Sequence, residues 1–385
     1  MNADERRCAL ALSRMGYHNI TVLRELYNAW GSMADIVKQH AHPEQLAPNM
    51  PERLLAAFAH TDEHLKRADE EMRFAQDNNI SIITLADEAY PQRLKACFDA
   101  PLALFFKGNT NLNAKHCISI VGTRKATPYA ADCIAQLTAR LKQLCPDILI
   151  VSGLAYGVDI MAHRQAIDHA LPTVAVLAHG LDTLYPSRHR KEATLMMQNG
   201  GLLTEYFSQS KIDKRNFLQR NRIVAGMSAA TLLVESAEHG GGLVTCRLAQ
   251  SYQHDVFAFP GSINNPYSVG CNRLIRDNMA GLVTSAEDIL KAMAWEEDMK
   301  ETVATNGASS MGSSVLGATS ASTAKVPNGA QGVLDVLTKE NDLHIDIIAT
   351  RAGLPVNKVL ALLFQLEMSG MVSSLSGGRY HKVNS

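Results

Sequence analysis

The sequence predicts an α/β protein built on a doubly wound parallel sheet. Between residue 117 and about residue 290, apolar runs of four to six residues alternate with helical patterns of ten to fifteen. Runs that are apolar throughout are typical of strands covered on both faces, and the alternation requires a helix to cross over between successive parallel strands. Ligands of such sheets bind at the carboxyl ends of the strands, so functional residues are expected there.

The apolar runs place six strands in this region. Two shorter apolar runs precede them, at 80–85 and 102–106, with prolines between the two. These runs are expected to form a segment that connects to the sheet domain. The six predicted strands are 117–121, 148–151, 173–178, 202–205, 231–235 and 256–259.

The N-terminal residues show a helical pattern without the alternation of a strand. Apolar residues such as Ile20, Leu23 and Leu26 recur at intervals of three and four. A small helical domain is therefore predicted at 1–75, followed by the domain that contains the sheet at 76–295.

The C-terminal part divides into two regions of different composition. Residues 301–328 are mostly Ser, Thr, Ala and Gly, so ordering them would cost conformational entropy without a core to offset it. A flexible linker is therefore predicted at 296–328. Residues 329–385 contain three helical patterns, at 333–337, 345–352 and 356–368, followed by a β-like ribbon with glycine turns. This order predicts a winged-helix domain.

The composition excludes several classes of protein. The chain has 385 residues, 46% of them hydrophobic, and a formal net charge of -1, so it is too long for a disulfide-stapled scaffold and gives no global sign of a polyanion partner. Its seven cysteines include no C-x-x-C pair and are predicted to be reduced thiols. The N-terminus lacks the order of a signal peptide, and no apolar run approaches the ~18 residues of a membrane span. A cytoplasmic protein without a membrane partner is expected.

The first predicted strand leads into a turn suited to phosphate. Gly122, Thr123 and Arg124 follow it directly, before an amphipathic helical pattern. Unpaired backbone N–H groups and the dipole of a helix N-terminus attract anions, and this turn adds a hydroxyl and a guanidinium. The turn lacks the G-x-G-x-x-G pattern of dinucleotide-binding proteins, so an ordinary turn with a solvated arginine is equally compatible with it.

Two more loops place small residues at strand ends. Ser152 and Gly153 end the second strand, while Gly241 and Thr245 belong to a glycine-rich segment after the fifth. Neighbouring strand ends face a common crevice, so these residues are expected to line one site together with the first turn. A flexible turn is an equally good interpretation of the glycine-rich segment.

The most pronounced cluster is the basic segment 211–226. Asp213 is the predicted N-cap of a helix that ends near Gly226. The cations in its first turn oppose the helix dipole, a conflict that an anionic ligand would relieve. A Phe beside guanidinium groups suits single-stranded nucleic acid, because bases stack on the ring while cations contact phosphates. The alternative is a solvated charged helix with the Phe in the core. The predicted binding residues are Lys214, Phe217, Arg220, Asn221 and Arg222.

No catalytic residue is predicted. The chain has no G-x-S-x-G elbow, no H-E-x-x-H and no Walker lysine motif, and its Cys and His residues show no metal-ligand spacing. Glu205 and Glu235 end predicted strands and could be general bases, yet each could equally orient an arginine or cap a helix. No metal and no cofactor is expected.

Together these motifs resemble the DNA-processing protein DprA (Smf) family. The resemblance covers about residues 80–290, where the family's motifs occur in its order. It implies an extended Rossmann fold that binds single-stranded DNA, forms a homodimer and loads RecA recombinase onto incoming DNA during natural transformation, without an established catalytic step. The motifs that carry it are Gly122-Thr123-Arg124, residues 152–159, residues 217–228, the glycine-rich loop to Thr245, Pro260-Gly261 and residues 270–275.

The resemblance also implies roles for individual residues. Gly122, Thr123 and Arg124 look like the phosphate-binding turn, Lys214 like a phosphate contact and Phe217 like the ring on which a base stacks. Arg220, Asn221 and Arg222 look like the basic helix that lines the same pocket. Binding through the backbone and a ring implies a sequence-independent interaction.

A second resemblance keeps an enzyme open as the alternative function. The fold is also similar to nucleoside-monophosphate phosphoribohydrolases, in which the glycine-threonine loop is followed by a catalytic Glu. In this chain Thr245 is followed by Cys246 and Arg247, and no carboxylate occurs before Asp255. Because a general acid or base must lie within hydrogen-bond reach of the substrate, the binding function is favoured. A nucleotide-sensing module is a third possibility.

The winged helix shows a weak signal for DNA. Its presumed recognition helix, 356–368, offers Lys358 as its only cation, beside Glu367. Base contacts in a groove mostly need Arg, Asn or Gln on the presented face. A packing or partner-binding role is therefore expected for this domain.

Overall fold

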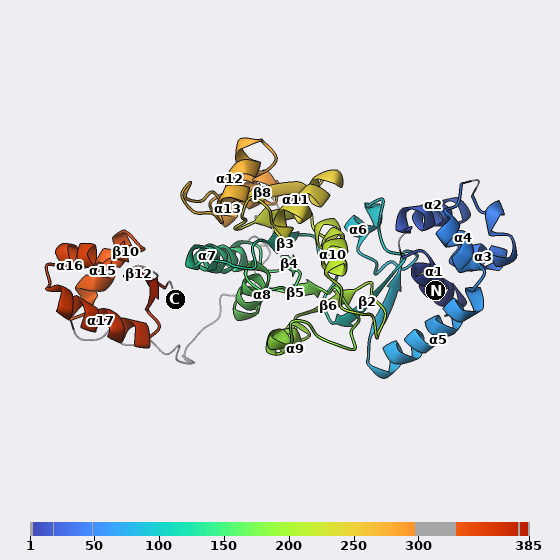
Figure 1. Cartoon of the computed structure of the whole chain (residues 1–385), viewed down its shortest axis with the longest axis horizontal. Coiled ribbons are helices and arrows are strands. Elements are labelled where there is room, and N and C mark those ends of the chain that lie inside the picture. Colours follow the sequence, from blue (N-terminus) through green and yellow to red (C-terminus); the bar gives the residue numbers. More distant parts are fainter. Residues whose placement is uncertain (1–2, 18, 48, 297–328, 376–377, 384–385) are drawn as a thin grey trace, which may run out of the picture. The chain divides into compact units, whose positions relative to one another are not determined.

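The computed structural model describes residues 3–17, 19–47, 49–296, 329–375 and 378–383. The described residues fall into two compact units. The larger unit contains the N-terminal helices and the sheet, up to residue 296 but without residues 127–132, which are grouped with the C-terminal domain that begins at residue 329 (Figure 1). Apart from its first residue, the predicted linker 296–328 lies outside the described residues.

The N-terminal residues are helical, as their periodicity predicts. Apolar side chains such as Leu10, Leu23 and Phe58 are fully or almost fully buried between the helices. The carboxylate of Glu5 accepts hydrogen bonds from the backbone N–H groups of Met33 and Ala34, which fixes the start of the third helix against the first. The helices are α1 (Ala3–Met15), α2 (Ile20–Trp30), α3 (Met33–Lys38), α4 (Glu52–Phe58) and α5 (Thr61–Asp77), with two short 3₁₀ turns, η1 (Gln39–Ala41) and η2 (Pro43–Gln45).

A nine-stranded sheet forms the centre of the larger unit, and all six predicted strands are present in it. Its order is β1-β2-β6-β5-β4-β3-β7-β8-β9, and every pair from β6 to β9 is parallel. The strands are β1 (Ser81–Thr84), β2 (Ala103–Gly108), β3 (Cys117–Val121), β4 (Leu149–Ser152), β5 (Thr173–Val176), β6 (Gly200–Thr204), β7 (Ala230–Leu233), β8 (Asp255–Ala258) and β9 (Gly281–Leu282).

Two features of the sheet differ from the prediction. The runs at 80–85 and 102–106 form β1 and β2, which continue the sheet as antiparallel strands next to β6 instead of forming a separate connecting segment. The parallel sheet therefore has an antiparallel edge, a common arrangement in doubly wound folds. Strand β9 was not predicted because two residues are too few to show any period.

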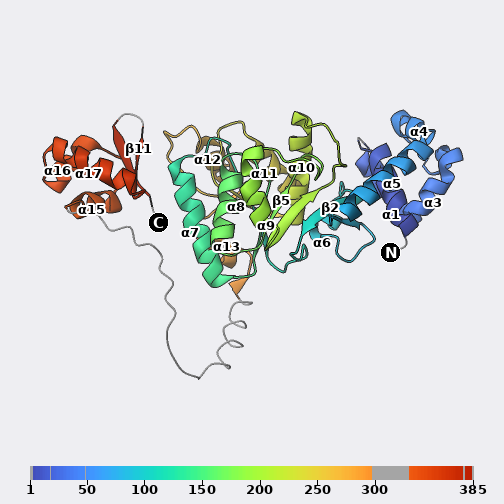
Figure 2. The ribbon, with the colours of Figure 1, turned by 90° about the horizontal axis from the view of Figure 1, so that it is seen from below.

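Helices cover both faces of the sheet. Figures 1 and 2 show α8 and α9 on one face and α10 and α11 on the other. The chain winds from β3 through β4 and β5 to β6, then returns through α10 to β7 on the other side of β3. The strand order therefore reverses at β3, and the carboxyl ends of β3 and β7 flank the switch point where such sheets bind ligands. The helices of this unit are α6 (Gln92–Ala96), α7 (Pro128–Leu144), α8 (Val158–Asp168), α9 (Arg190–Met196), α10 (Lys214–Met227), α11 (Gly241–Ser251), α12 (Val269–Arg276) and α13 (Ala286–Ala292), with the 3₁₀ turn η3 (Ser187–His189) before α9.

The C-terminal domain is a winged helix, as predicted. Helices α15 (Gln331–Lys339), α16 (Ile345–Ala352) and α17 (Val356–Met368) pack around Val333, Leu337, Ile348, Val359 and Leu363. Strands β10 (Leu343–His344), β11 (Val372–Leu375) and β12 (Arg379–Lys382) form a small sheet in the order β10-β12-β11. The part of the predicted ribbon at 376–377 lies outside the described residues.

Taken singly, none of the helices in the described residues has the length and apolar composition to cross a membrane. The bent pair α16 and α17 meets that test when the two are counted together, and its buried side chains belong to the core of the winged helix.

Candidate nucleic-acid interface

A cavity of about 460 Å³ lies at the switch point of the sheet. The loops after β3, β4 and β7 line it, together with one side of α10 and the first turn of α11. We call it the strand-end pocket. It brings together most of the predicted site residues from four separate stretches of the chain: Gly122, Thr123, Arg124, Gly153, Phe217, Arg220, Asn221, Gly241 and Thr245.

The turn after β3 holds a cation over an aromatic ring. The backbone N–H of Thr123 donates to the carbonyl of Glu235 at 2.8 Å, which ties this turn to the end of β7. Arg124 is exposed, and its guanidinium carbon lies 5.6 Å from the centre of the Phe217 ring. Such cation–π contacts attract by about 0.5 to 1 kcal/mol at exposed sites. Phe217 is half-buried and not part of the core, which contradicts the alternative interpretation of this residue.

The glycine-rich loop after β7 presents a helix N-terminus to the pocket. Helix α11 begins at Gly241 after the N-cap Gly240, which has no side chain to accept a hydrogen bond from the first turn. Within the described residues no side chain caps its first N–H groups, so these donors at the positive end of the helix dipole are available to an anion. A Cβ atom at Gly241 would meet no atom within 4 Å, so this glycine faces open space. The hydroxyl of the buried Thr245 donates back to the Gly241 carbonyl at 3.3 Å.

Arg220 lines the pocket with a guanidinium that is already engaged by the protein. Its side chain is 3% exposed, and it donates to the carbonyl oxygens of Gly153 and Val176 at the ends of β4 and β5. Burial lowers its pKa, and the neighbouring Asp159 carboxylate opposes that shift. A Cβ atom at Gly153 would lie 2.3 Å from the Arg220 guanidinium, so a larger residue at this position would displace the guanidinium. Arg220 thus holds the two strand ends in place while one side of it faces the cavity.

Three predicted residues do not line the strand-end pocket. Arg222, expected beside Arg220, forms a buried ion pair with Glu205 and donates to the Asp99 carbonyl instead. The reason is helical spacing, since residues two apart face different directions on a helix. The Ser152 hydroxyl is buried and donates to the Ile120 carbonyl at 2.6 Å. Lys214 is exposed at the start of α10, outside the pocket lining.

The structure adds aromatic residues that the sequence patterns did not reveal. Tyr185 comes from the loop between β5 and α9, and its ring lies 5.7 Å from that of Phe217, edge to face. It is 45% exposed, so its ring is accessible to a ligand. His239 and Tyr267 line the pocket itself. None of these residues belongs to a periodic pattern, and the Tyr185-Pro186 pair after a strand was the one available signal.

The carboxylates near the site are engaged in structural contacts. Asp159 lines the pocket, its pKa is raised by burial, and it accepts from the Ala155 N–H at 3.4 Å. Glu205 and Glu235, the two possible bases, do not line the pocket. Across the described ranges of the chain, no group of three His, Cys, Asp or Glu side chains is placed to hold a metal ion.

Comparisons with known proteins agree with this fold and site. Residues 81–294 match the family of DNA recombination-mediator protein A, and residues 317–378 match the DprA winged helix domain. Protein Smf of Escherichia coli (strain K12) is 33% identical over 318 residues, which cover 81% of this chain and 80% of that protein. DNA processing protein DprA of Bacillus subtilis (strain 168) is 35% identical over 252 residues, which cover 65% of this chain and 77% of that protein.

Two solved structures resemble the chain in three dimensions. DNA processing protein A from Streptococcus pneumoniae superposes with a TM-score of 0.62 at 30% identity, covering 73% of this chain and 95% of that one. A structure that describes the single-stranded DNA binding mode of DNA processing protein A from Helicobacter pylori superposes with a TM-score of 0.51 at 29% identity, covering 56% of this chain and 96% of that one. With a family match over more than half of its length and relatives matched over most of theirs, the chain belongs to the DNA recombination-mediator protein A (DprA, Smf) family.

Proposed function

We propose that this protein binds single-stranded DNA at the strand-end pocket. The observation that carries the proposal is the pairing of Arg124 with Phe217 at the switch point of the sheet. A nucleotide has an anionic phosphate and a flat base. Arg124 can bind the phosphate while Phe217 stacks on the base, because the two side chains lie close enough to contact the same nucleotide. Tyr185 adds a second ring, which is exposed, next to the half-buried ring of Phe217.

The charge of the pocket suits a phosphate. Arg124, Lys125 and Arg220 line it against the single carboxylate of Asp159. The N-terminus of α11 adds N–H donors that need no side chain and therefore read no sequence. An anionic backbone passing over Gly241 would meet these donors without a steric barrier.

Two properties of the ligand follow from this arrangement. Contacts to phosphates and to the face of a base do not distinguish the four bases, so the binding is sequence-independent. A base that stacks on Phe217 has to leave its partner, so duplex DNA binds more weakly because unpairing costs a few kcal/mol. The single-stranded DNA binding described for the Helicobacter pylori structure supports the same ligand class.

The family membership supports finer proposals. The bound protein is a homodimer that loads RecA recombinase onto incoming single strands during natural transformation in the cytoplasm, and it carries out no chemical step on the DNA. The absence of Glu205 and Glu235 from the pocket lining and the structural contacts of Asp159 favour binding over phosphoribohydrolase chemistry.

Fluorescence anisotropy of a labelled single-stranded oligonucleotide tests the proposal. We expect tight binding that weakens steeply with salt and that neither a duplex nor a mononucleotide displaces. Arg124→Ala is expected to weaken binding about equally for all sequences and to flatten the salt dependence. Arg188→Ala, an exposed arginine of η3 outside the pocket lining, is the matched control.

Other results would redirect the proposal. Displacement of the strand by a mononucleotide, or release of a free base from one, would favour the nucleotide-processing alternative. For the recombinase, the expected result is faster RecA filament growth on single strands in the presence of the protein. Equal growth rates with and without the protein would remove the loading function and leave the binding function intact.

The winged helix is proposed to bind a protein partner instead of reading a DNA groove. One side of α17 exposes apolar side chains spaced four residues apart, and they accompany a single cation, Lys358. Phe364→Asp is expected to leave the affinity for single-stranded DNA unchanged. A large loss of affinity would assign DNA contacts to this helix. The exposed residues are Val356, Leu360, Phe364 and Met368.

We also propose the domain limits 1–75, 76–295 and 329–385, with 296–328 as the linker. Limited proteolysis is expected to cut first within the linker and to leave the flanking parts whole. Early cleavage inside 76–295 would contradict these limits.

A further inference from the structure

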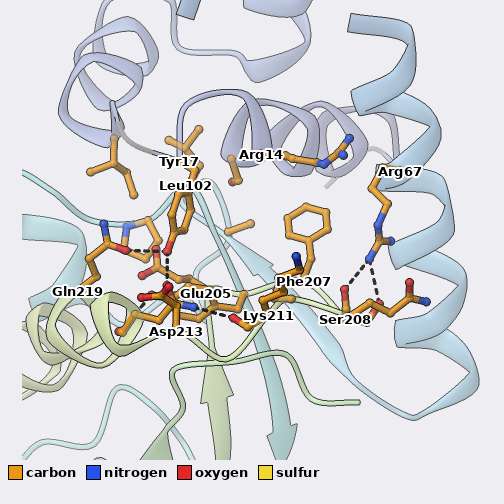
Figure 3. A pocket seen from close by; sticks show the side chains of 18 of the residues that line it. Arg14, Tyr17, Arg67, Leu102, Glu205, Phe207, Ser208, Lys211, Asp213 and Gln219 are labelled. Carbon is orange, nitrogen blue, oxygen red and sulfur yellow. Dashed lines mark hydrogen bonds between the residues drawn. The ribbon is translucent and has the colours of Figure 1, made fainter. Parts of the chain in front are cut away.

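A second cavity, of about 590 Å³, lies between the N-terminal helices and the sheet. Arg14, Tyr17 and Arg67 line it from the helices, while Phe207 and Lys211 line it from the segment that follows β6 (Figure 3). We call it the N-terminal cleft. Its volume is within the range of about 300 to 1,000 Å³ found for ligand pockets.

Buried hydrogen bonds hold the two walls of the N-terminal cleft together. Glu71 of α5 is 1% exposed, and its carboxylate accepts from both the backbone N–H and the hydroxyl of Ser208, at 2.8 and 2.6 Å. Arg67 donates to Glu71 and to the Ser208 carbonyl, both at 2.8 Å. Across the cleft, the Tyr17 hydroxyl donates to Gln219 of α10 at 2.6 Å. The cleft is therefore a fixed feature of the larger unit and not a gap between loosely joined parts.

The charges of the cleft leave an excess of cations. Of its two carboxylates, Glu205 is paired with Arg222, while Asp213 caps α10. Of its four cations, Arg67 is paired with Glu71. The other three are Arg14, Lys211 and Arg215, all exposed, and within the described part of the chain none of them forms an ion pair.

The start of α10 separates the N-terminal cleft from the strand-end pocket. Arg215 and Gln219 line the cleft, whereas Leu218 and Asn221 line the pocket. Lys214 lines neither cavity and is exposed; it precedes Phe217 and Leu218 by three and four residues and therefore lies on the pocket side of α10. A helix with its side chains is about 10 to 12 Å wide, so a chain of a few nucleotides is enough to cross from one cavity to the other.

We propose that the N-terminal cleft holds the continuation of the DNA strand whose first part occupies the strand-end pocket. The proposal rests on the proposed function of that pocket. The strand passes over Lys214, and its phosphates are bound by Arg14, Lys211 and Arg215. Its bases lie toward the rings of Tyr17 and Phe207, which line the cleft. The helical N-terminal domain then lengthens the binding site, a role that its own sequence does not signal.

The test measures affinity against strand length. Labelled oligothymidylates from about 4 to about 16 nucleotides, the range of site sizes of single-strand-binding OB folds, are titrated with the full chain. The variant is Arg14→Ala with Lys211→Ala, and the control is Arg53→Ala with Lys191→Ala, a matched pair of exposed cations outside both cavities. Thermal unfolding checks that both proteins are folded.

We expect the variant to bind the shortest strands as the wild type does. Once the strand is long enough to reach the cleft, the variant is expected to bind about 10-fold more weakly, with a salt slope lower by about 0.7 for each phosphate that the variant no longer binds. The control is expected to match the wild type at all lengths. Strands with 5-iodouracil at one position are expected to cross-link to Tyr17 or Phe207 only when that position lies several nucleotides from the pocket.

Two results would overturn the proposal. One is a variant that binds every length as the wild type does. The other is an equal loss of affinity for short and long strands, which would reflect the general charge of the surface. A wild type that binds no strand of any length would instead overturn the proposed function of the strand-end pocket.

Discussion

The two halves of helix α10 have similar basic residues and opposite environments. At its start, Lys214 and Arg215 are exposed and form no ion pair within the described residues, and Phe217 is half-buried. Further along, Arg220 and Arg222 are buried and donate to carbonyl oxygens or to a carboxylate of the protein. The first half is therefore suited to bind DNA, and the second half holds the sheet, the helix and the loops in one arrangement.

The difference teaches that basic sequence alone does not identify a DNA contact. An exposed Lys keeps its charge available to a phosphate, whereas a buried guanidinium has to direct its donors to groups within the protein to offset the loss of water. Substitutions in the first half of α10 should consequently weaken DNA binding, whereas substitutions in the second half should lower the stability of the protein.

The largest effect is expected for Arg220→Ala. The change leaves the carbonyls of Gly153 and Val176 without their donor and Asp159 without its neighbouring cation. Each buried acceptor left without its donor costs about 1 to 3 kcal/mol, so the loss of two donors should lower the free energy of unfolding by about 2 to 6 kcal/mol in urea titrations. Unchanged stability with a large loss of DNA affinity would place Arg220 with the exposed half instead.

A slightly smaller effect is expected for Arg222→Ala, which leaves Glu205 buried without its partner. The free energy of unfolding should fall by about 3 kcal/mol. Replacing both residues, by Arg222→Met and Glu205→Leu, should restore much of the stability, because two apolar side chains avoid the desolvation of an unpaired charge. In a double-mutant cycle, additive losses from the two single variants would show that the pair is not coupled.

The stability of the protein should also depend on pH, because His163 is buried near Arg220. The pKa of His163 is lowered to about 3, mainly by burial and to a lesser extent by the charge of Arg220. Because the unfolded chain binds this proton below about pH 6.5 and the folded protein does not, stability is lost as the pH falls, by about 2 kcal/mol at pH 5 relative to pH 7. His163→Asn should show a smaller loss over this range. An equal pH dependence would assign it to other groups.

In the exposed half, Phe217→Ala should weaken binding of single-stranded DNA without changing the salt slope. Stacking of a base on a ring contributes about 1 to 3 kcal/mol, so the loss of affinity should be about 5- to 150-fold in anisotropy titrations. Phe98→Ala removes an exposed ring elsewhere and is the matched control. An affinity that does not change in Phe217→Ala would end the stacking role.

The smallest effect is expected for Lys214→Ala. Its stability should change by less than about 0.5 kcal/mol, as for other surface positions. The salt slope of DNA binding should decrease by about 0.7 if Lys214 binds one phosphate of the strand. A loss of stability comparable with that of Arg220→Ala would remove the contrast between the two halves.

The sequence by itself determined the α/β architecture and most of the residues around the strand-end pocket. Apolar runs and helical periods are local patterns, and parallel strands have to place the residues after β3, β4 and β7 at one edge of the sheet. Gly122, Gly153 and Gly241 could thus be assigned to one site from their positions after predicted strands. The winged helix was also predicted from local patterns, namely three segments with helical periodicity followed by a β-like ribbon.

Tertiary structure alone decided what each side chain does there. Arg220 contacts a carbonyl and Arg222 a carboxylate because different elements pack against the two sides of α10. The residues that they contact, such as Gly153 and Glu205, are far away in the chain. The same is true of the N-terminal cleft, whose cations Arg14, Lys211 and Arg215 come from distant parts of the chain. Burial and partner choice are long-range properties, so no local pattern in the sequence records them.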